Sequence, residues 1–464
     1  MPYSIQLTDA GRAYYANRDR DLERGVVHLI ERIGAENWQR RRQAVHDRYM
    51  AKLNARNTPV EGVSVRDRED EIAWYLFLGE TLIADPPAVD SDQAHRVWPY
   101  LSAFGRKLDA ILAIGNVDER IARLVREVRD QDPDQALFEL FVGASYVEES
   151  WSVDALPEAS GKTPDFEIKR GLVRFEVECK RLARRGEYTV LERDAWLRQW
   201  EPAGRWLVDE KLSFFFTILI HREVAALPSG YIFDALRGQY DGPGKGFRPL
   251  DSEALTIQCA PTDYPRIAAS LRGSRTKVSS SAERALITGR YEPDFGLTAA
   301  IGGVPVTVGP PTVAGNVYWD SITYASGAYW RGDSPAAIDT KARDIVKRLS
   351  EATAQFSGRR DGIVHLGIEA AEGDDVELLR TDKIIASVSR FDPRGKPLEW
   401  VFVHYFKGAS LPDGRWTLDE TCQSHGRASP VYRPLRAEYV VSPADAPTVD
   451  RFATSSGAAS GSGS

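Results

Sequence analysis

Two acidic residues and a lysine near the middle of the chain have the types and spacing that suit metal-assisted hydrolysis. Asp165 follows a proline, and Glu178 and Lys180 lie in the next segment of alternating apolar residues. Carboxylate oxygens are hard ligands that suit Mg²⁺ or Mn²⁺, with water and a substrate phosphate completing the coordination. A lysine beside such a cation can contact the attacking water or the phosphate and neutralise developing charge. The three residues therefore predict a site that hydrolyses phosphodiester bonds.

The segments around these residues predict a β-hairpin. Two strand-like runs, 163–169 and 172–181, are separated by an Arg-Gly pair. Taking this pair as a two-residue loop places Asp165 opposite Glu176 and diagonal to Glu178. Diagonal neighbours lie roughly 7–8 Å apart at the backbone, which is close enough for the carboxylates of Asp165 and Glu178 to hold one cation.

The same register separates the hairpin into a polar face and an apolar face, because side chains alternate along a strand. The polar face comprises Asp165, Glu167, Arg174, Glu176, Glu178 and Lys180. The apolar face comprises Phe166, Ile168, Val173, Phe175, Val177 and Cys179. A three-residue loop would mix the two faces, so the sequence favours the register with the two-residue loop. The alternative is a solvated surface hairpin, in which the acids pair with the basic residues across the strands.

The combination of Pro164-Asp165 with Glu178-Cys179-Lys180 resembles the active-site hairpin of the PD-(D/E)XK, or restriction-endonuclease-like, nuclease superfamily. The resemblance implies an α/β protein with a restriction-endonuclease-like core. It implies that Asp165 and Glu178 are the principal metal ligands and that Lys180 is the catalytic lysine. The match covers roughly a tenth of the chain, and the small Cys179 fits the apolar face.

Members of this superfamily usually add a glutamate from a helix that precedes the hairpin. Glu139, in the helical segment 136–146, is the matching residue and by resemblance a further metal ligand, with Glu148 and Glu149 as competitors. Some members also place a glutamine on a later helix, which makes Gln355 an accessory candidate.

The resemblance implies a Mg²⁺- or Mn²⁺-dependent hydrolase, an endonuclease that binds DNA in preference to RNA and serves bacterial restriction, repair or defence. Basic residues flank the hairpin and are candidates for contacts with the nucleic-acid backbone: Lys162, Arg181, Arg184 and Arg185. Cutting both strands would favour a homodimer, and a defence-system protein is a further candidate partner. The alternatives are a catalytically silent nuclease fold that binds nucleic acid or protein, and a structural protein without a metal site.

The order of the predicted elements divides the 464 residues into five parts. A helical N-terminal domain covers 1–130 and would bind substrate, partner or signal. The nuclease-like core covers 131–225, and a β-rich insertion or subdomain covers 226–334. Another α/β region, 335–445, would either complete the core sheet or form a layer of its own. Residues 446–464 form a tail rich in Ser, Gly and Ala, which predicts flexibility.

Composition excludes several other classes of protein. The apolar run at 212–221 is too short for the ~20 residues of a membrane span and predicts a strand buried on both faces. Three widely spaced cysteines and seven scattered histidines favour neither a zinc ribbon nor a disulfide scaffold. The formal charge of −7 means that any affinity for phosphate must come from local patches. The first residues lack the pattern of a signal peptide, so we expect a cytoplasmic protein that does not associate with membranes.

Overall fold

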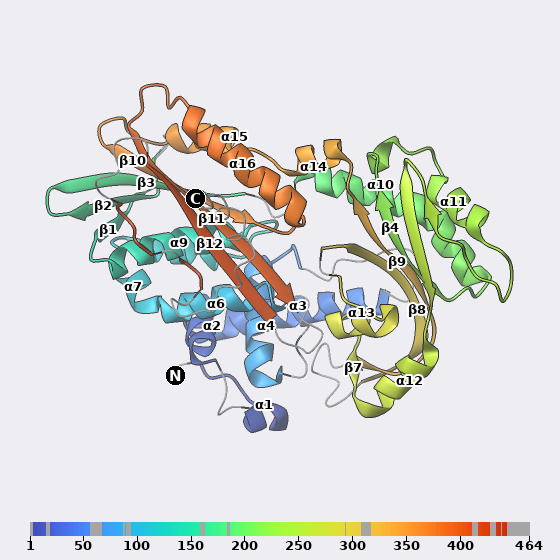
Figure 1. Ribbon diagram of the computed structural model, residues 1–464. Helices are drawn as coiled ribbons and strands as arrows, with labels where there is room; N and C mark the ends of the chain where they lie inside the picture. The colour runs from blue at the N-terminus through green and yellow to red at the C-terminus, as the bar shows by residue number, and fades with distance from the viewer. Residues whose placement is uncertain are drawn as a thin grey trace, which may run out of the picture.

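The protein is a mixed α/β structure with two separate sheets, seen side by side in the computed structural model (Figure 1). The structure describes the chain apart from residues 1–2, 15–18, 56–66, 87–88, 90–93, 158–162, 183–185, 293, 308–316, 411–415, 427–432, 438 and 443–464. The predicted tail therefore lies outside the described residues. No helix within the described ranges is long and apolar enough to cross a membrane.

The first sheet has six strands in the order β1-β2-β3-β10-β11-β12. Their bounds are β1 (Ser152–Ala155), β2 (Phe166–Arg170), β3 (Val173–Arg181), β10 (Asp361–Glu369), β11 (Leu398–Ser410) and β12 (Trp416–Gly426). The central strands β3, β10 and β11 run parallel, while β1, β2 and β12 join antiparallel at the two sides. The strands of the segment 335–445 thus continue the sheet that the hairpin β2–β3 begins.

One face of the first sheet is covered by α9 (Pro133–Glu148), and the other by α15 (Val346–Thr353) and α16 (Asp374–Arg390). Helix α9 begins three residues before the predicted segment because the side chain of Asp132 caps it and Pro133 fits its first turn. The alternation of β3 then places Val177 and Cys179 against the α9 side.

The N-terminal third of the chain is helical, as its pattern predicts. Its helices are α1 (Asp9–Tyr14), α2 (Arg20–Ile33), α3 (Ala35–Ala55), α4 (Glu71–Ala84), α6 (Trp98–Arg106), α7 (Leu108–Leu112) and α8 (Val117–Leu124). Helices α2 and α6 cross so closely that a Cβ on Gly105 would lie 1.8 Å from the carbonyl oxygen of Asp21. One hydrophobic cluster runs from α2 through α9 into the first sheet. The helices are therefore built onto that sheet and share its core.

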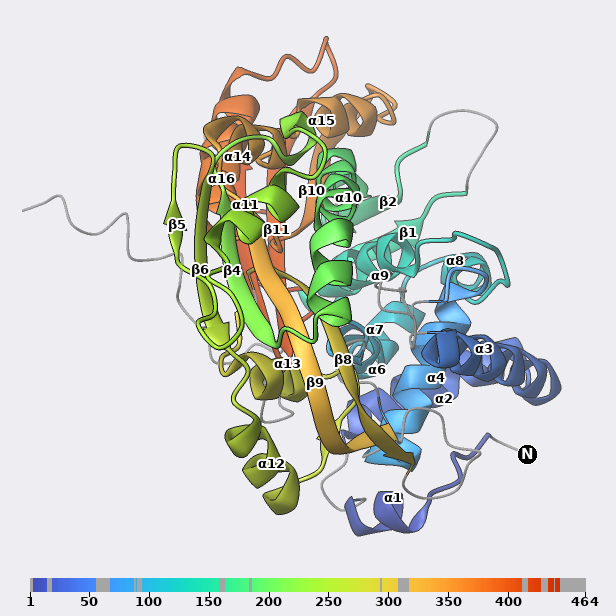
Figure 2. The same cartoon turned by 90° about the vertical axis from the view of Figure 1, so that its right-hand side faces the viewer.

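The second sheet is formed by β5 (Leu250–Asp251), β6 (Leu255–Pro261), β4 (Phe214–Ile220), β9 (Val317–Gly332) and β7 (Thr276–Lys277), with β8 (Gly296–Thr307) paired to β9. Helices α10 (Glu187–Asp209) and α11 (Tyr231–Gln239) pack with one hydrophobic cluster of this sheet. Helices α12 (Tyr264–Gly273) and α13 (Ser281–Thr288) pack with another. Figure 2 shows β4 and β9 between these helices.

The whole second unit is inserted between β3 and β10, and α14 (Pro335–Lys341) leads the chain back toward the first sheet. The run at 212–221 contains the predicted strand, β4, which has a paired strand on each side. Its burial alternates, because Ile218 and Ile220 are buried whereas Thr217 and Leu219 are half-buried, so burial on both faces is only partial. The strand pairs with β6 and β9, however, and so belongs to the second sheet, whereas the expected boundary at 225 assigned it to the nuclease-like core. Apolar periodicity identified the strand but carries no information about which distant strand becomes its neighbour.

Candidate functional site

The hairpin β2–β3 forms with a register that differs by two residues from the predicted one. Arg170 pairs with Val173, so the loop consists of Gly171 and Leu172. Glycine takes the first loop position because its φ of 62° is a conformation that other residues rarely adopt. Since Phe166 pairs with Val177, Asp165 lies directly across from Glu178 and is no longer diagonal to it. A shift of two residues preserves the faces, so the predicted separation of polar and apolar side chains holds.

Asp165, Glu178 and Lys180 come together just before β2 begins, where β3 extends past β2 and keeps only β10 as a paired strand. The backbone N–H of Cys179 donates to Asp165 Oδ2 over 2.8 Å, which fixes the aspartate beside β3. Lys180 Nζ lies 2.5 Å from Glu178 Oε1. The Glu178 side chain is only 3% exposed, whereas that of Lys180 is 25% exposed. Lys180 is therefore the most exposed of the three side chains, since that of Asp165 is 15% exposed.

Glu139 reaches the same place from α9, and a glutamine one turn earlier anchors the helix to β3. Gln135 donates to the carbonyl of Cys179 and accepts from the N–H of Arg181, so it occupies the edge of β3 that β2 leaves open. Gln135 also donates to Glu139 Oε1 over 2.7 Å. The spacing of four residues on a helix is a signal by which Gln135 could have been found from the sequence.

The structure adds Arg120 of α8 to the site, a residue that the sequence did not reveal. Its Nη1 lies 2.5 Å from Glu139 Oε2 and 3.2 Å from Asp165 Oδ1. Its Nη2 donates to the carbonyl oxygen of Asp165 over 2.7 Å, and its guanidinium lies 4.8 Å from the ring centre of Phe166. Nothing local in the sequence marks Arg120, because the contact joins segments far apart in the chain.

Burial and mutual repulsion shift the ionisation of the carboxyl groups. Burial, together with the charge of Asp165, raises the pKa of Glu178 to about 8 despite the opposing effect of Lys180. The same two causes raise the pKa of Glu139 to about 7, against the opposing charge of Arg120. Burial lowers the pKa of Lys180, but the charge and hydrogen bond of Glu178 have the opposite effect, and the net result is a raised pKa. The carboxyl groups thus lie close enough to repel one another.

Among the three acids of this group, Glu178 has an oxygen atom that is available to a ligand. Glu178 Oε2 is buried and has no hydrogen-bond partner, although a buried carboxylate oxygen normally has one. Within the described ranges, no three His, Cys, Asp or Glu side chains form a ready metal-binding group. The side chain of Arg120 lies between Glu139 and Asp165, which explains why the three acids do not converge on one point.

Comparison with protein-family models, with curated proteins and with solved structures finds no match to this chain.

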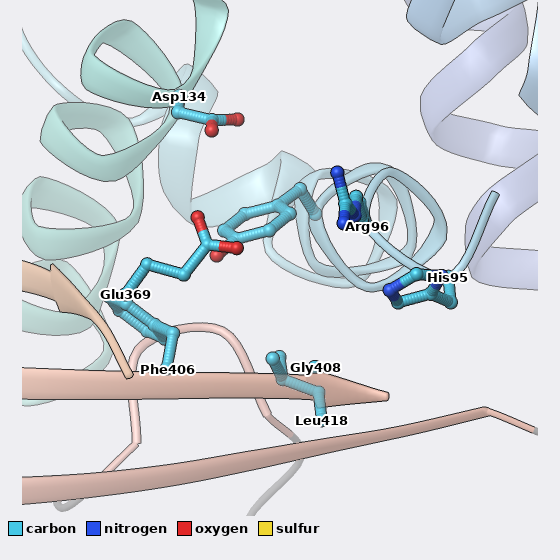
Figure 3. A pocket seen from close by; sticks show the side chains of 8 residues that line it. His95, Arg96, Asp134, Glu369, Phe406, Gly408 and Leu418 are labelled. Carbon is cyan, nitrogen blue, oxygen red and sulfur yellow. The ribbon is translucent and has the colours of Figure 1, made fainter. Parts of the chain in front are cut away.

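Of the residues predicted to contact nucleic acid, Arg181 is contradicted by its burial. Its side chain is 3% exposed and its guanidinium lies 5.0 Å from the ring centres of both Tyr100 and Phe406. As the next residue after Lys180 it points to the opposite, apolar face of β3, which the alternation of a strand requires. It adjoins a small pocket at the end of the sheet, whose lining Figure 3 shows: His95, Arg96, Tyr100, Asp134, Glu369, Phe406, Gly408 and Leu418.

Of the remaining predicted residues, the structure describes only Gln355. Lys162, Arg184 and Arg185 lie outside the described residues. Gln355 follows α15, and the nearby Ser357 donates to Glu176 at the other end of β3. The structure gives no contact between Gln355 and the carboxylates near Glu178.

Proposed function

We propose that the protein is a divalent-metal-dependent nuclease that hydrolyses phosphodiester bonds, with DNA as the first substrate to test. The observation that carries the proposal is the buried, unpartnered Glu178 Oε2, directly across the hairpin from Asp165 and beside Lys180. A pair of acids that share a polar face with a reachable lysine is sufficient equipment for metal-assisted hydrolysis.

The order of elements supports the same proposal. Helix α9 precedes the hairpin β2–β3, and the parallel strands β10 and β11 follow on the far side of β3. This arrangement resembles a restriction-endonuclease-like core, in which a helix and further strands complete the sheet after the lysine. Here the second sheet is inserted within that connection, so the resemblance holds only when β3 and β10 are considered as neighbours in space.

Asp165 and Glu178 would hold Mg²⁺ or Mn²⁺, which supplies a Lewis acid for the phosphate and lowers the pKa of a bound water. Cys179 N–H and Arg120 fix the carboxylate of Asp165. Lys180 is an ammonium at neutral pH, because the ordinary pKa of lysine is about 10.4 and that of Lys180 is raised further. Its partly exposed Nζ can therefore donate hydrogen bonds to a phosphate oxygen and stabilise the negative charge that develops there.

The test compares the wild type with Lys180→Met on supercoiled plasmid, linear duplex, single-stranded DNA and RNA, in Mg²⁺, Mn²⁺ or EDTA. We expect cleavage by the wild type that EDTA abolishes, and a loss of about 100-fold or more in Lys180→Met because a charge-stabilising donor is removed. Lys169→Met is the matched control, since Lys169 lies on the same hairpin and pairs with Asp154 and Glu167 away from the site. Equal cleavage by wild type and Lys180→Met would refute the proposed role.

A second candidate function is a silent nuclease fold that binds nucleic acid without cutting it. Arg120 favours it, because this guanidinium already neutralises charge on two of the three acids. In that case all four substrates would stay intact in Mg²⁺ and in Mn²⁺. The wild type and Lys180→Met would both bind DNA in a mobility-shift assay, with or without EDTA.

A further inference from the structure

Arg120 is a fixed positive charge inside the carboxylate cluster. Four contacts hold it: the carboxylates of Glu139 and Asp165, the carbonyl oxygen of Asp165 and the ring of Phe166. The side chain is only 8% exposed. These contacts and this burial make Arg120 a fixed structural part of the site.

The arginine uses oxygens that a second metal ion would need. Glu139 Oε2 accepts from Arg120 and lies 3.4 Å from Arg123, while Glu139 Oε1 accepts from Gln135. Asp165 Oδ1 accepts from Arg120, and Asp165 Oδ2 accepts from the backbone N–H of Cys179. Glu178 alone keeps a buried oxygen without a partner.

The formal charges lead to the same count of ions. With all three acids ionised, Glu139, Asp165 and Glu178 contribute three negative charges, and Arg120, Arg123 and Lys180 contribute three positive ones. One divalent cation gives the cluster a net positive charge, which suits a phosphate. A second would add two further positive charges in a poorly solvated place, at a high electrostatic cost.

We infer that the site takes a single divalent cation, between Asp165 and Glu178, and that Arg120 fills the place of a second one. Glu139 is then a positioning residue, which holds Arg120 and does not ligate metal. The inference rests on the proposed function for the identity of the ion, but its test does not depend on cleavage.

The experiment measures bound Mn²⁺ per full-length chain by equilibrium dialysis and metal analysis at pH 7.5. We expect one ion in the wild type. Glu139→Gln should keep this ion with a Kd within about threefold, whereas Glu178→Gln should weaken it at least about tenfold because a charged ligand is lost. Two ions in the wild type, or an equal loss in Glu139→Gln and Glu178→Gln, would overturn the inference.

Variants of the arginine test its place in the cluster. Arg120→Met should admit a second ion, while Arg120→Lys, which keeps the charge, should still admit one. Arg123→Met is the control, since Arg123 is 31% exposed and lies 3.4 Å from the same oxygen of Glu139, and it should bind one ion. An unchanged single ion in Arg120→Met that has the wild-type near-ultraviolet circular dichroism would count against the inference. If Arg120→Met fails to fold, the number of Mn²⁺ ions bound by the wild type and by Glu139→Gln still tests the inference.

The nuclease proposal and this inference fail in different ways. One bound ion without cleavage of any substrate leaves the inference standing and defeats the nuclease proposal. Cleavage with two bound ions defeats the inference alone. A wild type that binds no Mn²⁺ overturns both.

Discussion

Replacing Glu178 by glutamine is expected to stabilise the fold at alkaline pH while it removes the proposed metal ligand. The pKa of Glu178 is raised from its ordinary 4.5 to about 8, first by burial and then by the charge of Asp165. Above pH 4.5 the folded protein therefore retains a proton that the unfolded chain releases. The free energy of unfolding falls as pH rises through this window and levels off above pH 8, because the native state binds more protons.

The size of the effect follows from the pKa shift. Each pKa unit corresponds to about 1.4 kcal/mol, so an increase from 4.5 to about 8 sets an upper limit of about 5 kcal/mol. Glutamine has nearly the same shape and no charge to repel Asp165. We therefore expect Glu178→Gln to match the wild type near pH 5 and to exceed it by about 3–5 kcal/mol at pH 8.5.

The assay is urea unfolding of both proteins at pH 5, 7 and 8.5, in EDTA and again in Mn²⁺. Mn²⁺ should restore the stability of the wild type at pH 8.5, since a ligand that binds only the native state must stabilise it, and should do little for Glu178→Gln. Glu176→Gln is the control on the same face, because the oxygens of Glu176 accept from Ser357. It should lose stability at all three pH values. A wild type and Glu178→Gln with the same dependence on pH would refute the reasoning.

Two further predictions concern the helical layer. Arg41→Met should lower the free energy of unfolding in urea by about 3–5 kcal/mol, because it leaves the buried Asp70 carboxylate without its partner; the oxygens of Asp70 lie 2.6 and 2.7 Å from the Arg41 guanidinium. The control Arg40→Met, at an exposed neighbouring residue, should lower it by less than about 1 kcal/mol. Similar losses in the two variants would contradict this account. Gly105→Ala should lower the free energy of unfolding by about 1–3 kcal/mol or more, since the new Cβ would lie 1.8 Å from the backbone of Asp21. Thermal unfolding measures this loss, and an unchanged melting temperature would show that α2 and α6 can move apart without cost.

Much of the first sheet could be predicted because its signals are local. The faces of the hairpin follow from strand alternation, and they survived a register error of two residues. That error was avoidable, because Gly171 at the first loop position satisfies the turn better than Arg170 does. The helix that carries Glu139 was also predicted from its apolar pattern, although its start depends on the cap at Asp132.

The remaining features depend on contacts between distant segments, which periodicity does not encode. The run at 212–221 looks equally apolar in either sheet, and its neighbours β6 and β9 come much later in the chain. Arg120 has no distinguishing sequence around it, yet it determines how Glu139 and Asp165 are arranged. Burial of Arg181 was implied by its position beside Lys180, because alternate residues of a strand face opposite sides.

The insertion between β3 and β10 has a consequence for a chain that is still being synthesised. When β3 leaves the ribosome it has β2 on one side, while the edge that receives β10 stays open until residues 361–367 appear. Glu178 pairs with Val364 across that edge, so its burial depends on a segment translated after the whole second sheet. Domains form largely as units during synthesis, so the inserted unit is able to fold before the first sheet closes. An incomplete chain therefore lacks the enclosed carboxylate cluster, and the proposed metal site forms only after β10 has docked.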